Sequence, residues 1–266
     1  MKTVIIPTLN EEANIGRLIP LIYRNMGDEE VSVVVVDDDS TDDTCGVVES
    51  LSRSYNIRLL ERSGLRGISS AVRDAARFAR NGHVAVMDAD FSHDPKYLPE
   101  FFRNIEQGYD IAVGSRYVPG GGVDGWPRHR VVLSLGATLI AKALLRVGVK
   151  DPMSGFAAFK SNQILVDGIG DSESKFLLDI LAYDRSLKVV EVPIVFSNRR
   201  LGSSKLNRNI LLGYLGQVGR QFILNGKGSP TAHSSRMHER RVDSAHLSSF
   251  EKTEFPLSLR TTKGAD

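Results

Sequence analysis

The chain of 266 residues contains a single cysteine, Cys45. One cysteine excludes a disulfide within the chain and a zinc site built from cysteines, and it fits a reducing, intracellular compartment. No uncharged apolar run reaches about 18 residues, so we expect no transmembrane helix. The N-terminal segment MKTVIIPTLNEE becomes acidic too soon for a secretory signal peptide. A net charge of only +2 predicts no general attraction to nucleic acid.

Two glycine-rich fingerprints of nucleotide-binding proteins are also absent, G-x-x-x-x-G-K-[ST] and G-x-G-x-x-G. Their absence argues against a nucleotide-binding regulator of either type. The first loop, PTLNEE, is acidic, whereas a metal-dependent nucleotidyltransferase is expected to carry an early glycine-rich loop with lysine or arginine. Such a transferase therefore remains only as an alternative reading of the chain.

Strand and helix signals alternate over residues 1–115. Apolar, β-branched runs predict strands, and stretches with helical spacing between them predict helices. This order predicts an α/β fold with a mainly parallel, doubly wound sheet and ligands beyond the carboxyl ends of its strands. The strands are expected within 2–7, 31–40, 57–62, 83–90 and 110–116, and the helices over 10–26, from 40 or 41 to 51, over 69–81 and over 94–107.

The pattern changes after Arg116. The segment YVPGGGVDGWPRHR is a glycine- and proline-rich loop longer than most connections, which indicates a function. An apolar helix is expected over 131–149 and another over 210–224, with further strands and loops between them. From Gly228 the chain is rich in serine, threonine and charge. We therefore expect one domain over residues 1–227 and a disordered tail over 228–266.

Three carboxylates crowd the stretch VMDADFSHDP, namely Asp88, Asp90 and Asp94. On an extended chain the first two point to the same side, because side-chain direction has a period of two. Oxygen ligands at a strand end suit Mg²⁺ or Mn²⁺, which bind through one or two carboxylates plus substrate phosphates. The alternative is that these residues only cap the next helix, which is credible for Asp94.

Two more polar strand ends are expected at the same edge of the sheet. The first is DDDS, Asp37 to Ser40, where a carboxylate can accept from a ribose hydroxyl or a base N–H; for Ser40 a helix N-cap is the preferred reading. The second is PTLNEE, with a rigid turn at Pro7 and Glu11 at a helix start. Three such ends converging on one crevice predict a ligand site.

Seven motifs together resemble one family. In order they are IIPTLNEEANI, VVVVDDDSTDDT, GISSAVRDA, VMDADFSHDP, AVGSRYVPGGGVDGWPRHR, DPMSGFAAFK and RRLGSSK. Over residues 1 to about 225 the chain resembles the dolichyl-phosphate (polyprenyl-phosphate) mannosyltransferases, which are inverting family-2 glycosyltransferases with a GT-A fold. The resemblance implies a nucleotide-sugar donor, GDP-mannose, and a polyprenyl- or dolichyl-phosphate acceptor.

The resemblance also implies roles for individual residues, position by position. Asp88 and Asp90 correspond to the metal pair for Mg²⁺ or Mn²⁺, and Ser92 stands where the family often has a longer glutamine ligand. Arg116, Arg130 and Ser134 correspond to an acceptor-phosphate site, with Asp90 also essential for catalysis. The implied donor contacts are Pro7, Leu9, Glu11, Val36, Asp38, Asp88, Ala89, Asp90, Arg116, Arg199 and Lys205.

The acceptor's chemistry indicates the mechanism. A lipid phosphate is already an anion at neutral pH, so it attacks the anomeric carbon without a general base. The runner-up function within this class is glucose transfer from UDP-glucose to the same acceptor. A non-catalytic, partner-binding homologue is also retained, because Ser92 departs from the family pattern.

The expected location is the cytoplasmic side of a membrane, where the protein is peripheral. The helices at 131–149 and 210–224 are expected either to lie in the membrane interface, with Lys142, Arg146 and Arg220 at the headgroups, or to pack on the sheet. Family resemblance adds small membrane-protein subunits as partners. No nucleic-acid partner is expected.

Overall fold

The structure, a computed structural model, describes residues 1–63, 67–79, 82–145, 148–170, 175–197 and 257–260. Several predictions fall outside these residues: Arg199, Lys205, Arg146, the helix at 210–224 and most of the tail that begins at Gly228.

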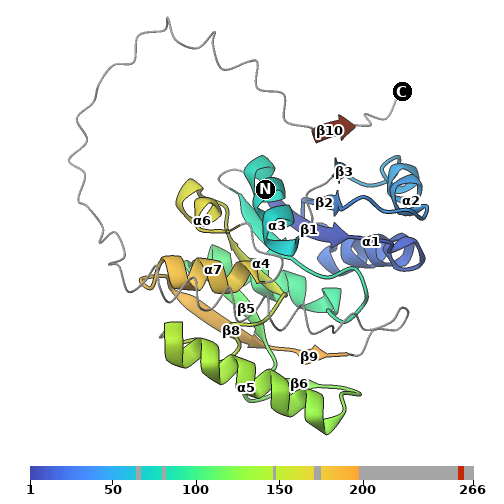
Figure 1. Cartoon of the computed structure of the whole chain (residues 1–266). Helices are drawn as coiled ribbons and strands as arrows, with labels where there is room; N and C mark the ends of the chain where they lie inside the picture. Colours follow the sequence, from blue (N-terminus) through green and yellow to red (C-terminus); the bar gives the residue numbers. More distant parts are fainter. Residues whose placement is uncertain (64–66, 80–81, 146–147, 171–174, 198–256, 261–266) are drawn as a thin grey trace, which may run out of the picture.

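A single large sheet runs through the protein in the order β10-β3-β2-β1-β4-β7-β5-β8 (Figure 1). Strand β1 (Lys2–Thr8) pairs in parallel with β2 (Val31–Asp37) and with β4 (His83–Val86). Strand β3 (Ile57–Arg62) pairs in parallel with the outer side of β2. The carboxyl ends of these strands therefore meet at one edge, because neighbouring parallel strands end on the same side. This half of the sheet is as predicted.

The other half contains one reversed strand. Strand β7 (Ala157–Lys160) lies between β4 and β5 (Ile111–Ser115) and is antiparallel to both, whereas β8 (Val189–Pro193) is parallel to β5. Since β7 runs in the opposite direction, it begins at the edge where β4 and β5 end. The segment just before β7 is thereby brought to the carboxyl-end edge, which the sequence pattern did not predict.

Helices cover both faces of the sheet, as predicted. Successive strand residues alternate between two apolar clusters: Val4 and Ile6 pack with the helices of one face, and Ile5 packs with those of the other. The first face carries α1 (Glu12–Met26), α2 (Thr44–Leu51) and α4 (Leu98–Glu106), and the second carries α3 (Ile68–Ala76), α6 (Gln163–Asp167) and α7 (Phe176–Tyr183). Two short 3-10 helices, η1 (Arg77–Ala79) and η2 (Pro95–Tyr97), complete the set.

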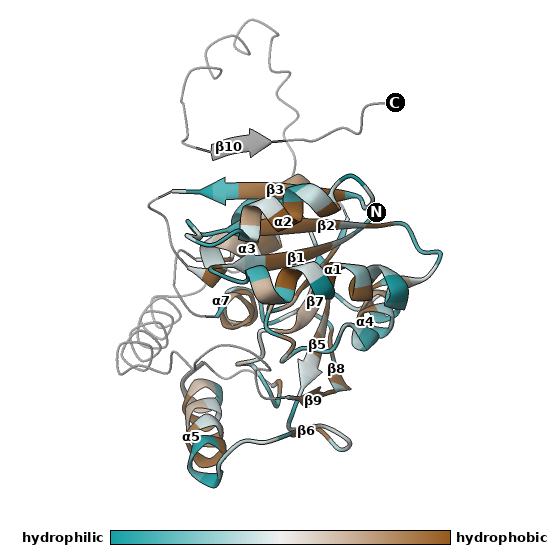
Figure 2. Cartoon of the chain, turned by 90° about the vertical axis from the view of Figure 1, so that its right-hand side faces the viewer, coloured by the Kyte–Doolittle hydropathy of each residue, from teal (hydrophilic) through white to brown (hydrophobic). Residues whose placement is uncertain are grey.

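Helix α5 (Arg128–Leu145) lies at the end of the protein opposite β3 (Figures 1 and 2). It follows β6 (Gly122–Val123), which pairs in parallel with β9 (Val195–Phe196) to form a small second sheet. Ala141 joins the core, but several apolar side chains of α5 are exposed: Val132, Leu133, Leu135, Leu139 and Ile140. Among the described residues, no helix has both the length and the apolar character needed to cross a bilayer.

The described part of the tail is a short strand. Strand β10 (Leu257–Arg260) pairs antiparallel with β3 at the edge of the large sheet. The sequence prediction for this region was a disordered tail over residues 228–266. The remainder of the predicted tail lies outside the described residues.

Several element boundaries differ from the prediction: α3 ends at Ala76, α4 begins at Leu98 after η2, and α5 begins at Arg128 instead of 131. Two further differences have local causes. Helix α2 begins at Thr44 instead of Ser40 or Thr41, because Ser40 is bound to a preceding carboxylate. Strand β4 ends at Val86 instead of Asp90, because the chain turns and Phe91 adopts a φ of 60°. The extended geometry assumed for Asp88 and Asp90 is therefore wrong, although both residues do lie beyond the carboxyl end of β4.

Candidate active site

The loops after β1 and β2 are tied together by hydrogen bonds. Asp38 donates its backbone N–H to the carbonyl of Thr8 (3.0 Å), and Thr8 Oγ1 donates to Asp37 Oδ2 (2.9 Å). Asp37 also accepts from the backbone N–H and the hydroxyl of Ser40, at 2.8 and 2.6 Å. Ser40 in turn accepts from the backbone of Asn10 (2.8 Å). Ser40 thus holds the loop and does not cap α2, which corrects the preferred reading of its role.

The predicted nucleoside contacts lie along this edge in unequal settings. Pro7, Leu9 and Glu11 are half-buried in the segment that ends β1 and enters α1, and Glu11 accepts from Asn14 Nδ2 at 2.7 Å. Val36 is fully buried in the core. Its side chain is therefore not available to a nucleoside, and only its backbone carbonyl, which accepts from the Thr8 hydroxyl at 3.3 Å, faces polar groups.

Asp38 is held by a buried arginine that the sequence prediction missed. Arg62 is 2% exposed, and its Nε and Nη2 both donate to Asp38 Oδ1, the former at 2.7 Å. Its Nη1 donates to Ser70 Oγ (3.0 Å) and Asp74 Oδ2 (3.1 Å). The other oxygen of Asp38 accepts from the backbone N–H of Gly67 (3.1 Å). The Asp38 carboxylate is therefore fixed in place before any ligand binds.

The loop after β4, residues 87–94, which we call the carboxylate loop, is built around a buried histidine. Asp90 is 4% exposed, and its Oδ1 accepts from the backbone N–H of Ser92 (3.0 Å). His93 is also buried, stacks on Phe156 at 4.8 Å, and its Nδ1 accepts from the backbone N–H of Asp88 (3.0 Å). Burial lowers the pKa of His93 against the opposing charges of the two aspartates, which favours the neutral ring that this hydrogen bond requires.

The donor atoms of this loop fit a divalent cation. Asp88 keeps about a third of its side chain exposed (34%), and Asp90 offers a second carboxylate beside it. The hydroxyl of Ser92 is buried and has no hydrogen-bond partner among the described residues, so a bound cation would satisfy its oxygen. No group of three histidine, cysteine, aspartate or glutamate residues forms a metal centre within the described ranges. Two carboxylates plus substrate phosphates is the usual way in which Mg²⁺ is held.

Arg116 follows β5 and is locked by an aspartate from the segment before β7. Its Nε and Nη2 donate to the two carboxylate oxygens of Asp151, both at 2.7 Å, and its backbone N–H donates to Oδ2 at 3.0 Å. Asp151 is fully buried. Burial acts to lower the pKa of Arg116, but the hydrogen bonds and charge of Asp151 outweigh it and raise that pKa. Asp151 was not assigned a role from sequence, although its motif DPMSGF was noted.

Aromatic rings surround the same guanidinium group. The Cζ atom of Arg116 lies 5.1 Å from the ring centroid of Tyr117, 5.5 Å from that of Trp126 and 5.7 Å from that of Phe196. Arg130, from the start of α5, lies 4.1 Å from the Trp126 ring. The structure thus brings the guanidinium groups of Arg116 and Arg130 to one indole ring.

Ser134 lies one turn further along α5. The hydroxyl of Tyr117 donates to its Oγ at 2.8 Å, so the Ser134 hydroxyl keeps its own proton for a second partner. The three residues predicted to bind the acceptor phosphate, Arg116, Arg130 and Ser134, are therefore connected through Tyr117 and Trp126.

Lys175 interacts electrostatically with both the carboxylate loop and the arginine site. It precedes α7, and burial lowers the pKa of its ammonium group, an effect that Asp88 and Asp151 oppose and Arg116 reinforces. Because these charges act on one lysine, the predicted metal pair and the predicted phosphate site belong to one electrostatic region. Lys175 was missed from sequence, where it stands alone in a polar stretch.

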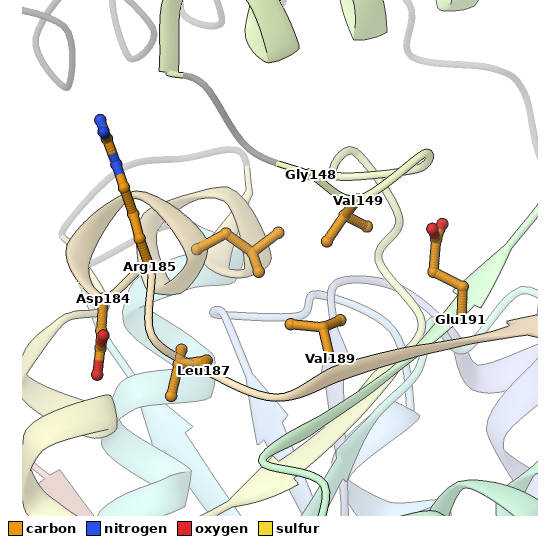
Figure 3. A pocket seen from close by; sticks show the side chains of 8 residues that line it. Gly148, Val149, Asp184, Arg185, Leu187, Val189 and Glu191 are labelled. Atoms are coloured by element: carbon orange, nitrogen blue, oxygen red, sulfur yellow. The ribbon is translucent and has the colours of Figure 1, made fainter.

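A separate cavity of about 340 Å³ lies beside β8 (Figure 3). None of the predicted site residues lines it. Glu191 connects it to the site, because its carboxylate accepts from the backbone N–H of Lys150 and of Asp151 at 2.9 and 3.0 Å. This cavity is therefore not the candidate active site. Its lining residues are Gly148, Val149, Leu181, Asp184, Arg185, Leu187, Val189 and Glu191.

Comparison with solved structures shows a shared GT-A fold. Glucosyl-3-phosphoglycerate synthase from Mycobacterium tuberculosis, in complex with Mn²⁺, UDP and glucosyl-3-phosphoglycerate, matches with a TM-score of 0.59 at 21% identity, covering 87% of this chain and 81% of that one. The same enzyme with Mg²⁺ and UDP matches with a TM-score of 0.57 at 21% identity, covering 87% and 81%.

Comparison with curated sequences finds closer relatives. Dolichol-phosphate mannosyltransferase of Pyrococcus furiosus is 38% identical over 85% of this chain, which spans 64% of that protein's length. Dolichol-phosphate mannosyltransferase of Saccharomyces cerevisiae is 32% identical over 83% of this chain and 86% of its own length. Polyprenol monophosphomannose synthase of Mycolicibacterium smegmatis is 34% identical over 77% of this chain and 80% of its own length.

The family profile described as "Glycosyl transferase family 2" matches residues 3–163, which include the carboxylate loop, Arg116, Arg130 and Asp151. Together with the fold and the three relatives, this match settles the classification: the chain belongs to glycosyl transferase family 2.

Proposed function

We propose that this protein transfers mannose from GDP-mannose to a dolichyl or other polyprenyl phosphate with inversion at the anomeric carbon, releasing GDP. The observation that carries the proposal is the buried, preset guanidinium of Arg116 at the same sheet edge as Asp88 and Asp90. One group suits an acceptor phosphate and the other suits a donor diphosphate with its cation. The names of the three sequence relatives, two dolichol-phosphate mannosyltransferases and a polyprenol monophosphomannose synthase, support mannose as the transferred sugar and a lipid phosphate as the acceptor.

The proposal includes Mg²⁺ or Mn²⁺ at Asp88 and Asp90, with Ser92 as a further oxygen ligand. Bound there, the ion would neutralise negative charge on the leaving diphosphate. The fit of the buried Ser92 hydroxyl and the two carboxylates supports this assignment, as does the presence of Mn²⁺ or Mg²⁺ with UDP in the structural neighbour. Arg199 and Lys205, which lie outside the described residues, are proposed to bind the donor diphosphate.

The chain's own residues would act on the acceptor by binding and orientation. Arg116 has its Nε and one Nη2 N–H committed to Asp151, which leaves its Nη1 edge for a phosphate oxygen. Arg130 adds a second charge and Ser134 a hydroxyl. A phosphate monoester is anionic at neutral pH, so no side chain is needed to remove a proton before its oxygen attacks the sugar. One displacement converts an α-linked donor into a β-linked product.

The proposed site of action is a membrane surface, reached through α5. Its first turn carries Arg128 and Arg130, and its exposed side chains include Val132, Leu133 and Leu139, at 65–67% exposure. Exposed apolar residues beside basic ones are the composition of helices that lie in the bilayer interface. We propose peripheral attachment on the cytoplasmic side by this face, with small membrane subunits as further partners.

Product analysis tests the reaction. With GDP-mannose, a polyprenyl phosphate and Mn²⁺, we expect mannosyl lipid and GDP, and we expect Asp90→Asn to abolish turnover. Product only from UDP-glucose would reassign the donor, release of pyrophosphate would indicate a nucleotidyltransferase, and no product from any donor would indicate a non-catalytic homologue. Near wild-type turnover by Asp90→Asn with metal still required would show that the metal ligand is misassigned.

Flotation with liposomes tests the membrane surface. The wild type is expected to float with anionic vesicles at low salt, and Leu133→Gln combined with Leu139→Gln is expected to float less. The control is a double substitution on α1, which packs on the sheet: Arg24→Lys with Asn25→Gln. This variant should float as the wild type does. Absence of any lipid association by the wild type would overturn this part of the proposal.

A further inference from the structure

The single tryptophan of the chain, Trp126, has an unsatisfied polar group next to the two arginines. Its indole nitrogen is buried, and its N–H has no hydrogen-bond partner in the part of the chain that the structure describes. A buried donor without an acceptor destabilises a folded protein, so such groups usually mark a ligand, a water or a functional constraint. The indole N–H can only donate, so its missing partner must be an acceptor.

Positive charge on two sides indicates the kind of acceptor. The guanidinium carbon of Arg130 lies 4.1 Å from the Trp126 ring and that of Arg116 lies 5.5 Å from it. The face of an indole ring attracts cations, whereas its N–H edge is positive and attracts anions. An oxyanion with several oxygens, such as a phosphate, can accept from the guanidinium groups and from the indole N–H together.

The position of the ring in the fold favours one phosphate over another. Trp126 lies two residues before the start of α5, the helix whose exposed surface includes Val132, Leu133 and Leu139. A phosphate joined to a long apolar chain could place its charge at Trp126 and its chain along those residues. The diphosphate of a nucleotide sugar has no apolar chain to match this surface, and the carboxylates suited to its cation lie on the loop after β4.

We propose that Trp126 is a phosphate-binding residue for the acceptor: its ring holds Arg116 and Arg130 in position, and its indole N–H donates to an oxygen of the acceptor's phosphate. This inference rests on the proposed function, because it assumes a lipid monophosphate as one of the two substrates. It assigns a second role to the loop YVPGGGVDGWPRHR, which delivers both a charge-positioning ring and a hydrogen-bond donor to one oxyanion.

Fluorescence offers a direct test, because emission from this protein's tryptophan comes only from Trp126. The full chain is titrated with farnesyl phosphate, with farnesol to control for the apolar chain, and with GDP plus Mn²⁺ to control for the diphosphate. We expect a saturable change in emission with farnesyl phosphate and a much smaller one with the other two ligands. A saturable change with GDP alone would place the ring at the donor and overturn the inference, as would equal changes with farnesol and farnesyl phosphate.

Two variants separate the N–H from the ring. Trp126→Phe keeps an aromatic face for the arginines and removes the donor, so the KM for lipid phosphate should rise about tenfold, the loss expected for a hydrogen bond to a charged group. Trp126→Leu also removes the ring and should raise that KM further. In both, the KM for GDP-mannose should stay within twofold, a split that a purely structural role through Phe196 packing would not produce. Tyr109→Phe, on an exposed ring elsewhere, is the matched control and should change neither KM.

The outcomes distinguish this inference from the proposed function. If the wild type forms mannosyl lipid but Trp126→Phe keeps its lipid-phosphate KM within twofold, the role of Trp126 is refuted and the proposed function stands. If the wild type forms no product, the proposed function fails. The fluorescence titration then still decides whether a lipid monophosphate binds at Trp126.

Discussion

The buried pair of Arg116 and Asp151 allows a sharp prediction. Asp151→Asn keeps the size of the side chain and removes its charge, which leaves a guanidinium that is only 8% exposed without a counter-charge. Breaking a buried pair from one side typically costs about 3–5 kcal/mol, because the remaining charge stays desolvated. Asparagine retains one oxygen for Arg116, so we expect the lower end, about 3 kcal/mol of unfolding free energy, and a Tm lower by roughly 6–12 °C.

Urea denaturation followed by circular dichroism measures this change directly. Asp94→Asn is the matched control: it is the same substitution in an exposed pair, where Asp94 and Lys96 are 41% and 57% exposed at 3.0 Å. Exposed pairs contribute at most about 1 kcal/mol, and asparagine caps a helix as well as aspartate, so this variant should stay close to the wild type.

A double variant separates lost pairing from lost packing. Arg116→Met together with Asp151→Asn removes both charges, so it should be less destabilised than Asp151→Asn alone. The reasoning is refuted if Asp151→Asn unfolds within about 1 kcal/mol of the wild type, or if the double variant loses the sum of the two single losses.

Three further predictions concern Cys45 on α2, Ser92 on the loop after β4 and Gly155 just before β7. Burial first, and then nearby carboxylates, raise the pKa of Cys45 to about 12, so its reaction with a thiol reagent at pH 8 should be slow and should speed up about tenfold per pH unit without a plateau below pH 11. Because the folded value exceeds the ordinary 9.0, the thiol's contribution to stability is complete below pH 9 and declines above it; a plateau near pH 9 would contradict the burial. Ser92→Ala removes a buried hydroxyl that has no partner among the described residues, so the unfolding free energy of the metal-free protein, measured in urea, should rise by about 1 kcal/mol. The Mn²⁺ concentration for half-maximal activity should rise severalfold, and unchanged metal dependence would remove Ser92 from the ligand set. A Cβ at Gly155 would lie 3.4 Å from His93 Cε1 and 3.7 Å from Asp88 Oδ1, so Gly155→Ala should be tolerated. The larger Gly155→Val should displace the His93 ring and the Asp88 carboxylate and lower the affinity for Mn²⁺. Equal Mn²⁺ affinity in the two variants would show that position 155 does not crowd these side chains.

Local pattern was sufficient for the parallel half of the fold. Continuous valine and isoleucine runs such as 33–36 fit only strands that are covered on both faces, and Val33 and Val34 do pack against opposite layers. The same reasoning placed Asp88 and Asp90 at a carboxyl-end edge. It failed on their conformation, because the turn at Phe91, with its φ of 60°, leaves no periodic signal.

Long-range pairing limited what could be said of the site. The charge of Arg116 was evident, but its partner is separated from it by 35 positions and is one of 32 acidic residues. Arg62 likewise looked like the end of an ordinary strand, yet it is the buried residue that fixes Asp38. Neither pairing follows from composition or spacing, since both depend on which loops the sheet brings together.

By itself, the sequence determined the chemical inventory and the order of the elements: an acidic pair after an apolar strand, basic residues in the following loops, and alternating helices and strands, all of which are written in local periodicity. Only the tertiary structure decided that β7 runs backwards between β4 and β5. Because β7 is reversed, Asp151 and Gly155 lie at the same sheet edge as Arg116 and Asp88, so residues far apart in the sequence form one site. The physical reason is that strand direction within a sheet depends on global packing and on how the chain connects the strands, and neither can be read from a short stretch of sequence.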